Sequence, residues 1–445
     1  MVFRGVKYHI PATFPEPKRA ELVRLLKEHH AKSADTVFDA THIITNSEDF
    51  KGCEQVNAGK VSVVTGLWVE RSIAAKKMQS ETYYSASPSK LFSGVIACSA
   101  DLSPGDEEVF AVTIAALGGQ WRVNCNATVT HLFAASRSSK RYEKAMQNRS
   151  KTHIKVLLPD WFNDTLRLGT RDLDTTGYEW ETPAMEARGA ELQSFSLKPI
   201  GYSSNVWAGR RILLSSSLDL TPSKRCMVED GIRKCQGVLV ELTSNDGAGT
   251  FWEELELVDK KRCEVLITRH RAGNAFLLAW EEGITVGTLR WLLEMQASGI
   301  VSGPRDRILH FPHPPVKVIG IKNTSICLSH YKDESAEYLK KLIKFMGGGF
   351  TTKLEVDNAV LVVASHPHCK VIADAKERRI PVVNHTWVED CFIQWKHLDP
   401  TLPKYTLKLS DADDDFAAEV GYRGVGSEIE EIVAAEQTRR WHLGR

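Results

Sequence analysis

The sequence predicts an α/β protein made of four copies of one small module, each a four-stranded parallel sheet flanked by about three helices. The main observation is a spacing that occurs four times. A short β-branched run is followed, seven residues after its first residue, by a tryptophan. Strand-like and helix-like stretches recur in the same order around each copy, with a period of about 90 residues. The length of 445 residues allows about three domains, or four of this size.

Each copy of the repeated stretch is expected to form a strand and then a helix. The β-branched runs suit buried parallel strands, and they begin at Val61, Ile154, Ile284 and Ile380. A side-chain oxygen stands where each helix would begin, at Thr65, Asp160, Thr288 and Thr386. The tryptophans are Trp68, Trp161, Trp291 and Trp387. Each would pack its ring on the core, and its indole N–H requires a partner. We therefore expect these four residues to be structural.

The other elements follow from apolar patterning and from turn residues. The first module, residues 1–85, is expected to have strands over 2–10 and 41–44, a helix over 18–30 and a weak helix over 49–58. The second, 89–180, has strands over 91–98, 121–123 and 130–133, with helices over 107–117 and 139–147. Gly118 and Gly119 follow its first helix. We expect them to end that helix, because glycine just past a helix end adopts the left-handed backbone that terminates it.

The second half of the chain repeats this order. A linker over 181–204 contains Pro, Ser and Gly and shows little periodicity. The third module, 205–312, diverges most: its strands are expected over 206–214 and 264–267, its helix over 222–235, and an insertion over 243–260. The fourth, 315–406, has strands over 324–328 and 359–363 and helices over 334–346 and 368–378, with Gly347 and Gly348 after the first helix. The acidic tail, 407–445, is expected to be solvated, with a helix over 428–438.

Composition restricts the class of protein. The net charge is +1, so the chain as a whole lacks the electrostatic footprint of a nucleic-acid binder. Nine scattered cysteines include no C-x-x-C pair, which argues against a zinc site and against a secreted disulfide framework. The segments 366–369 and 310–313 contain His or Cys but have no further ligand nearby. We expect no metal, no cofactor, no membrane span and a reducing compartment, hence cytosol or nucleus.

These motifs together resemble the BRCT repeat, the module named after the C-terminal domain of a breast-cancer gene product. The resemblance depends on the glycine pairs, on the four tryptophans and on two Thr-His pairs at the central strand, Thr41–His42 and Thr130–His131. It covers about 370 of the 445 residues. The third module lacks both the glycine pair and the Thr-His pair. The layout of two repeats, a linker and two further repeats is similar to the N-terminal half of the fungal regulator of Ty transposition family of DNA-damage scaffolds, related to PTIP in animals.

The resemblance implies a phosphate pocket in the second module. In such a pocket a Ser or Thr ends the first strand, a backbone N–H follows it, and a cation projects from the second helix. Ser99 and Ala100 match the strand end. Arg141 matches the cation through the pattern basic–aromatic–x–x–Ala, with Lys140 and Lys144 beside it. The alternative is that these residues belong to a solvated basic face together with Arg137, Arg149 and Lys151.

The other modules match the pocket less well. The fourth offers Ser329 and Lys370 as a secondary candidate, although Val371 occupies the matching position of the helix. The third offers Ser215 but has Ala275 at the basic position. The first has His9-Ile10-Pro11 where the hydroxyl would be. We expect these modules to supply packing surfaces.

The resemblance implies a non-catalytic nuclear scaffold for DNA repair and replication stress that binds short acidic or phosphorylated motifs. The partners it implies are a nuclease scaffold, the SMC five-six complex and a cullin-ligase adaptor. The family's C-terminal pair, which reads a phosphorylated histone tail, is not expected among these residues. Three alternatives remain open: a replication-checkpoint adaptor of the topoisomerase-binding type, direct DNA binding through the basic second module, and a regulatory fragment of a ligase or polymerase. Direct DNA binding is not the preferred interpretation.

Overall fold

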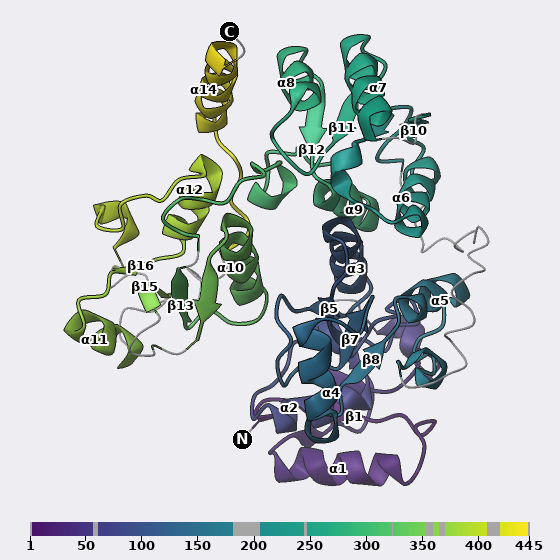
Figure 1. Cartoon of the computed structure of the whole chain (residues 1–445). Helices are drawn as coiled ribbons and strands as arrows, with labels where there is room; N and C mark the ends of the chain where they lie inside the picture. Colours follow the sequence, from purple (N-terminus) through teal and green to yellow (C-terminus); the bar gives the residue numbers. More distant parts are fainter. Residues whose placement is uncertain are drawn as a thin grey trace. The chain divides into compact units, whose positions relative to one another are not determined.

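The computed structural model describes residues 2–56, 61–180, 205–243, 247–322, 324–352, 354, 359–364, 370–406 and 419–443. These residues fall into two compact units, Met1–Gly201 and Tyr202–Arg445. Each unit contains two four-stranded sheets (Figure 1). The predicted linker over 181–204 and residues 407–418 of the predicted tail lie outside the described residues. We call the four modules repeats one to four, keeping the boundaries given above.

All four sheets have the same strand order and are parallel throughout. In chain order the strands of each repeat lie 2-1-3-4, so the first and third strands are central. Repeat one contains β1 (Lys7–His9), α1 (Lys18–Glu28), β2 (Lys32–Ser33), β3 (His42–Ile44), β4 (Ser62–Val64) and α2 (Gly66–Ala74). Repeat two contains β5 (Ile96–Ala100), α3 (Pro104–Ala116), β6 (Gln120–Trp121), β7 (His131–Ala134), α4 (Lys140–Thr152), β8 (Lys155–Leu157) and α5 (Asp160–Leu168).

Repeats three and four follow the same plan. Repeat three contains β9 (Arg211–Leu214), α6 (Pro222–Lys234), β10 (Val238–Val240), α7 (Gly247–Asp259), β11 (Val265–Ile267), α8 (Asn274–Glu281), β12 (Thr285–Gly287) and α9 (Leu289–Ser298). Repeat four contains β13 (Ser325–Ser329), α10 (Asp333–Met346), β14 (Gly349–Thr351), β15 (Ala359–Ala364), α11 (Lys370–Glu377), β16 (Val382–Val383) and α12 (Thr386–Gln394). A final helix, α14 (Glu428–Leu443), follows. The predicted fold class is confirmed.

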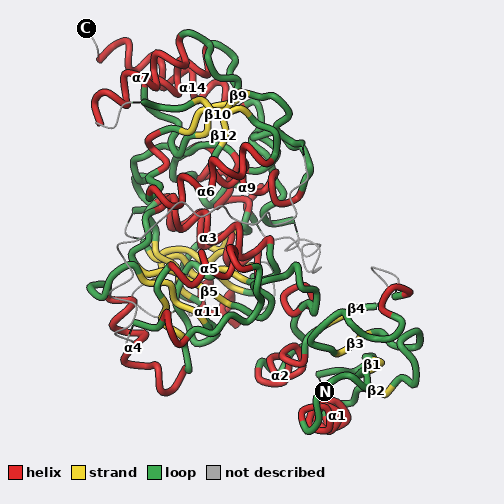
Figure 2. The backbone as a smooth tube through the Cα atoms, turned by 90° about the vertical axis from the view of Figure 1, so that its right-hand side faces the viewer, coloured by secondary structure: helices red, strands yellow, loops and turns green. Residues whose placement is uncertain are grey.

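Helices pack against the sheets. In repeat one, α1 and α2 lie side by side on one face (Figure 2). Leu22 and Leu26 of α1 share a core cluster there with Trp68 of α2. In repeat two, Phe110 of α3 and Phe162 of α5 stack at 3.9 Å on one face, whereas α4 buries Ala145 on the other. Parallel sheets bury both faces, which explains why their strands are apolar in both side-chain directions.

The four repeated tryptophans have equivalent environments. Their side chains are at most 2% exposed. Each lies in the last helix of its sheet, and each indole N–H donates to a backbone carbonyl 11 or 12 residues further along the chain. The acceptors are Gln79 (2.8 Å), Leu173 (3.1 Å), Ser302 (3.0 Å) and Leu398 (3.0 Å). Each ring is thus buried and hydrogen-bonded, and the partner of each indole is the segment that leaves the repeat.

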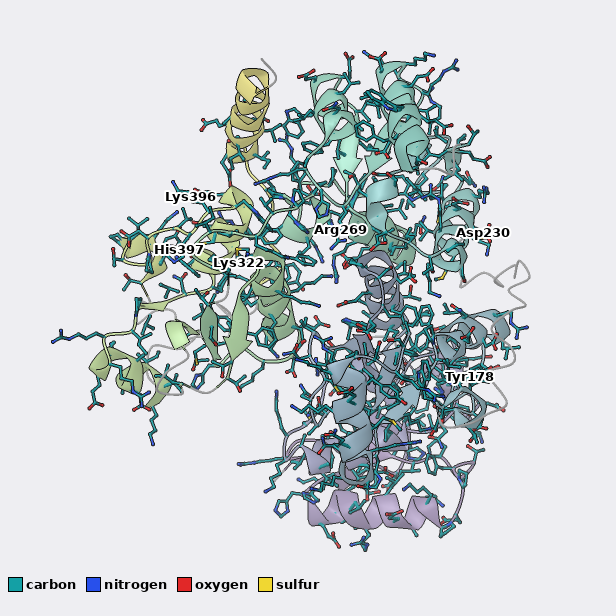
Figure 3. The ribbon with its side chains drawn as sticks, in the orientation of Figure 1. Tyr178, Asp230, Arg269, Lys322, Lys396 and His397 are labelled. Atoms are coloured by element: carbon teal, nitrogen blue, oxygen red, sulfur yellow. The ribbon has the colours of Figure 1, made fainter. Side chains whose placement is uncertain are left out.

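This exit segment is then bound to the fourth strand. The backbone N–H just after that strand donates to the carbonyl of a residue in a 3-10 turn: Thr65 to Tyr84 (2.8 Å), Leu158 to Tyr178 (2.9 Å), Thr288 to His310 (2.9 Å) and Asn384 to Tyr405 (2.9 Å). In repeat two, the Tyr178 hydroxyl also donates to Asp164 of α5 (2.7 Å; Figure 3). Each repeat therefore closes on itself before the chain continues.

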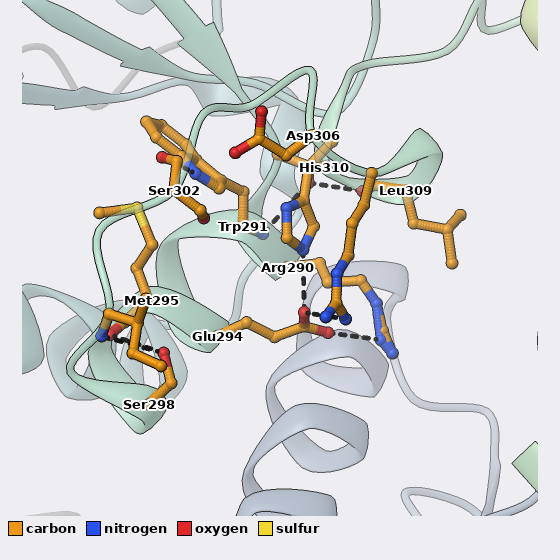
Figure 4. A network of polar contacts seen from close by, with 12 residues as sticks. Arg290, Trp291, Glu294, Met295, Ser298, Ser302, Asp306, Leu309 and His310 are labelled. Carbon is orange, nitrogen blue, oxygen red and sulfur yellow. Dashed lines mark hydrogen bonds and ion pairs between the residues drawn. The ribbon is translucent and has the colours of Figure 1, made fainter. Parts of the chain in front are cut away.

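A charged network holds the exit segment of repeat three to α9 (Figure 4). The carboxylate of Glu294 contacts Nε2 of the buried His310 (2.8 Å), with Arg290 at 3.3 Å and Arg307 at 3.7 Å. Burial alone raises the pKa of Glu294, but Arg290, His310 and Arg307 lower it to about 2. The ionised carboxylate therefore stabilises this contact at neutral pH.

Several predicted strands begin too early for a common reason. In three repeats the apolar residues before the first strand form a turn that places an aromatic ring against the repeated tryptophan. The ring centroids of Phe3, Phe92 and Trp207 lie 5.1, 6.0 and 5.2 Å from the tryptophan of their own repeat. The strands expected over 2–10, 91–98 and 206–214 accordingly begin only at Lys7, Ile96 and Arg211.

Two other predictions are corrected. The weak helix expected over 49–58 is a single 3-10 turn at Cys53–Gln55 within its described part. The insertion over 243–260 contains the helix α7. The glycine pair behaves as expected: Gly118 has φ +87°, and a Cβ on Gly119 would lie 2.6 Å from Ile114 and 2.9 Å from the Phe92 carbonyl oxygen.

The described part of the C-terminal tail is packed rather than solvated, contrary to the prediction. Ile429 and Val433 of α14 are fully buried in the core that repeats three and four share. The N–H of Ile308 donates to the carbonyl of Arg423 (3.0 Å). Arg423 also lies 2.5 Å from Asp390 of α12. The signal that sequence reasoning missed is the spacing of four apolar residues in an acidic segment. These residues are Val420, Val425, Ile429 and Val433.

One carboxyl beneath this segment is poorly satisfied. Glu389 is 1% exposed, and its Oε1 has no hydrogen-bond partner among the described residues. Burial raises the pKa of Glu389 to about 7, although Arg423 opposes the rise. A carboxyl whose pKa is higher in the folded state than in the unfolded state favours folding when protonated. This contribution is lost as pH rises from about 4.5 to about 7.

We therefore predict that Glu389→Gln is more stable than the natural chain at pH 8, because it removes a buried charge but keeps the shape. The difference in the midpoint of thermal unfolding should shrink as pH falls and vanish below about pH 4.5. Glu431→Gln, at an exposed position of α14, serves as the control. A difference that did not depend on pH would contradict this assignment.

Candidate functional site

The Thr-His pairs are part of the core frame. The Thr130 hydroxyl accepts from the N–H of Ile96 (2.9 Å) and contacts Nδ1 of His131 (2.7 Å), whose ring stacks on Trp161 at 5.2 Å. Burial lowers the pKa of His131 to about 3, so the ring is neutral at physiological pH. Thr41 and His42 repeat these contacts in repeat one. The pairs therefore support the tryptophan and leave the strand ends free to vary.

At the end of β5, the side chains of the predicted pocket residues Ser99 and Ala100 lie on opposite faces of the sheet. Cys98 and Ala100 lie in the cluster that packs against Ala145 and Tyr142 of α4. Side chains alternate along a strand, so Ser99 between them is directed to the opposite face, and it is 3% exposed. On the face of α4 the strand therefore ends with an alanine methyl group.

The side chain of Arg141, in α4, contacts the backbone of β5 at the end of the strand. One terminal nitrogen, Nη1, donates to the carbonyl oxygen of Ser99 (3.0 Å), and Nη2 donates to Oδ1 of Asn124 (3.2 Å). The guanidinium is half-buried and is held in one orientation by these two bonds. Since a guanidinium has five N–H donors, three remain for other contacts.

Lys140 and Lys144 extend this positive charge into solvent. They lie one turn apart at the start of α4, so they share a face of the helix. Both side chains are exposed, and neither has an ion-pair partner within the described part of the chain. The positive end of the helix dipole adds to their field. The structure thus brings Arg141, Lys140 and Lys144 together, whereas the hydroxyl of Ser99 lies apart from them.

Three further residues complete the site, and sequence reasoning missed their arrangement. The Trp180 indole N–H donates to the Ala134 carbonyl (3.1 Å), and its ring contacts Tyr142 edge to face at 5.7 Å. Arg137 lies over the Trp180 ring at 5.2 Å. Asn124 orients Arg141, as described above. The signal for Trp180 was a tryptophan at the end of a repeat, outside the repeated spacing.

Comparisons with known proteins agree with this frame. A model of the BRCT domain matches residues 1–85, and a model of the twin BRCT domain matches residues 95–161 and 324–387. The chain is a tandem BRCT-domain protein. These matches correspond to repeats one, two and four, and repeat three has the same strand order.

Fungal multi-BRCT proteins are similar to the chain over most of its length. BRCT-containing protein 1 of Schizosaccharomyces pombe is 25% identical over 381 residues, which is 85% of this chain and 41% of that protein. Regulator of Ty1 transposition protein 107 of Saccharomyces cerevisiae is 20% identical over 413 residues, 82% of this chain and 37% of that protein. The chain therefore spans about two fifths of the length of these relatives.

Solved structures of the second relative share the fold. The crystal structure of yeast Rtt107 and Slx4 matches with a TM-score of 0.64 and 16% identity, covering 95% of this chain and 98% of that one. The crystal structure of yeast Rtt107 and Mms22 matches with a TM-score of 0.61 and 17% identity, covering 92% and 97%. At this identity the match shows the fold of four BRCT repeats.

In BRCT repeat four, the hydroxyl is located differently. Ser329 is the last residue of β13 and pairs with Ala364, as Ala100 pairs with Ala134 in repeat two. Ser329 thus shares the strand face of Cys327, which packs against Ile372 and Ala375 of α11. Lys370 is exposed at the start of α11. The metal candidate at 366–369 and the rest of the loop before α11 lie outside the described residues.

In BRCT repeat three, an internal carboxylate occupies the strand end. The N–H and the hydroxyl of Ser216 both donate to Oε2 of Glu254, at 3.2 and 3.1 Å, and Glu254 of α7 is 6% exposed. Ser215 contacts the Ser217 hydroxyl (2.9 Å), and Ala275 is buried in α8. In repeat one, Nδ1 of His9 contacts the Ala34 carbonyl (3.2 Å). The strand ends of these two repeats are thus used for internal contacts.

A cavity of about 680 Å³ lies elsewhere in the second unit. Its walls include Trp280, Ile284, Phe311, Arg305 and Glu430, and it is open on one side. Arg305 spans it by lying over the Trp280 ring (4.9 Å) and contacting Glu430 (3.0 Å). Within the described ranges, we find no group of three His, Cys, Asp or Glu side chains arranged for a metal ion. Among the same residues, no helix has the length and apolar character of a membrane span.

The Glu254 contact gives a testable expectation. Glu254→Ala should lower the midpoint of thermal unfolding, because the N–H and the hydroxyl of Ser216 both lose their acceptor. Added phosphate should recover part of this loss in the variant by filling the vacated position. In the natural chain, phosphate should have no such effect.

The measurement is thermal unfolding of the natural chain and of Glu254→Ala, in phosphate and in chloride at equal ionic strength. Glu256→Ala, on the exposed side of the same helix, serves as the control. An equal effect of phosphate on all three chains would show that Glu254 does not occupy an anion position.

Proposed function

We propose that the chain is a non-catalytic nuclear scaffold that recruits repair and replication-stress proteins by binding short acidic or phosphorylated segments. The observation that supports this proposal is the cation cluster of repeat two, Arg141 with Lys140 and Lys144. Arg141 is fixed by Ser99 and Asn124 at the end of a strand, and the lysines are exposed. A fixed guanidinium beside two mobile ammonium groups suits carboxylate or phosphate groups.

The end of β5 favours recognition of an acidic segment by its charge. With Ala100 on the face of α4, that face has no side-chain hydroxyl from β5 to donate to a phosphate. Acidic segments should therefore bind through aspartate and glutamate, and a phosphate should add affinity without being indispensable. Tyr142 and Trp180 offer apolar surface for residues between the acidic groups.

Partners are proposed from the relatives. Yeast Rtt107 was crystallised with Mms22 and with Slx4. We propose counterparts of these two proteins as clients of this chain, together with the nuclease scaffold, the cullin-ligase adaptor and the SMC five-six complex that the resemblance implies. Within the same class, a checkpoint adaptor of the topoisomerase-binding type is the alternative. Repeat one lacks a strand-end hydroxyl at Ile10 and Pro11, which argues against that alternative.

The test is the double variant Lys140→Glu with Arg141→Glu. Fluorescent peptides covering acidic segments of the Slx4 and Mms22 counterparts, with and without phosphorylation, should lose about tenfold or more in affinity, since each charge-assisted bond contributes about 1.5–3 kcal/mol. Lys151→Glu, which makes half of this charge change in the last turn of the same helix, should have little effect. Ser99→Ala should also change affinity less than about twofold.

Two outcomes would redirect the proposal. Unchanged affinity in the double variant would remove repeat two as the site, and Ser329→Ala with Lys370→Glu would then test repeat four. Binding of bare duplex DNA with a steep salt dependence, lost in the double variant, would instead favour DNA as the ligand of α4.

A further inference from the structure

Repeat two holds two cysteines in one packed cluster beside the cations of α4. Cys98, in β5, is fully buried, whereas Cys125, in the loop between β6 and β7, is partly exposed. Both belong to the cluster that packs under Tyr142 and Met146 of α4. Arg141 joins the two segments by donating to Ser99 and to Asn124, the sequence neighbours of the two cysteines, and both cysteines are free thiols. This is a buried thiol paired with an accessible one.

The surroundings favour the thiolate of Cys125. Its interaction with Cys98 lowers the pKa of Cys125 to about 7, with further contributions from Arg141 and Lys144 that outweigh burial. The pKa of Cys98 is raised well above its ordinary value by the same interaction and by burial. Burial also raises the pKa of Cys53 and of Cys226. Because the thiolate is the reactive form, Cys125 should react first among these residues.

We propose that Cys98 and Cys125 form an oxidisable dithiol, a modification site in which Cys125 reacts with peroxide and Cys98 resolves the product to a disulfide. An accessible thiolate next to a resolving cysteine is the arrangement that redox-sensitive sites share. The proposal stands independently of peptide binding.

The steps balance with hydrogen peroxide as the oxidant. The Cys125 thiolate attacks one peroxide oxygen, the O–O bond breaks, and hydroxide leaves, giving a sulfenic acid at Cys125. The sulfur of Cys98 then attacks the sulfur of Cys125, the S–O bond breaks, and the thiol proton leaves with the hydroxyl group as water. Two thiols and one peroxide become one disulfide and two waters. The two sulfurs lose two electrons, and the peroxide gains them.

Closure would act on the cation cluster through Arg141. Its two hydrogen bonds go to Ser99 and Asn124, which are the neighbours of Cys98 and Cys125 in the sequence. A bond between the two sulfurs draws residue 125 toward β5 and moves the Asn124 acceptor. The oxidised chain should therefore bind the acidic probe peptides several-fold more weakly, reversibly on reduction. This coupling, unlike the disulfide, rests on the proposed function.

The experiment treats the purified full chain with hydrogen peroxide under native conditions. The remaining thiols are then blocked, and the chain is digested without reductant. Mass spectrometry should find the Cys98 and Cys125 peptides joined with loss of two hydrogens. In Cys98→Ser, which removes the resolving thiol, dimedone should instead label Cys125 as sulfenic acid. In Cys125→Ser, neither product should form at this site.

Cys226 and Cys53 serve as internal controls in the same sample. At pH 7, iodoacetamide should modify Cys125 of the untreated chain about tenfold faster than either control, because its thiolate fraction is larger. This measurement remains decisive if Cys98→Ser fails to fold. Equal reactivity of the three residues, or no joined peptide after peroxide, would overturn the proposal. A disulfide without any change in peptide affinity would overturn only the coupling to Arg141.

Discussion

The hydrogen bond from each buried indole to the exit segment is the interaction on which the rest of the structure depends. It connects the last helix of a repeat to a carbonyl 11 or 12 residues later, at all four copies. The exit segment then returns to the fourth strand and closes the repeat. A small parallel sheet has a modest core, so a ring that is nearly fully buried and also hydrogen-bonded supplies both burial and direction.

With the frame fixed in this way, the strand ends are free to differ. Repeat two presents Arg141 and two lysines, repeat three fills the same region with Glu254, and repeat four places Ser329 on the face of α11. Repeat one uses its strand end for an internal contact of His9. The four repeats thus share one backbone but offer different chemistry. This arrangement suits a scaffold that presents one surface to clients and uses others for packing.

The fold could be predicted because the relevant signals are local and repeated. A tryptophan at fixed spacing, apolar strands and a glycine pair each report a backbone requirement within about ten residues. The errors arose where apolar residues had another use. Phe3, Phe92 and Trp207 lengthened the expected strands although they form turns against a tryptophan. The apolar residues of 419–443 were hidden among acidic ones, although Ile429 and Val433 complete a core.

The candidate site was only partly readable from the sequence. Arg141 could be singled out because it lies in a helical pattern, and in the structure it donates to the carbonyl of Ser99 in β5. The sequence could not predict on which face of the sheet the Ser99 side chain lies. A shift of one residue in a strand moves every side chain to the opposite face. The contacts of Asn124, Cys125 and Trp180 depend on loops that return from elsewhere in the chain. Such contacts leave no periodic signal in the sequence.

The most direct measurement for the central claim is thermal unfolding of four single variants, each with one repeated tryptophan replaced by phenylalanine. Phenylalanine keeps an aromatic ring but removes the N–H, leaving a buried carbonyl without its donor at a cost of about 1–3 kcal/mol. Each variant should lower the unfolding midpoint of its own unit by several degrees, at about 2–4 °C per kcal/mol. Trp252→Phe, at a ring 64% exposed on α7, should leave the midpoint unchanged. Four variants as stable as the natural chain would contradict the claim that these indoles close the repeats.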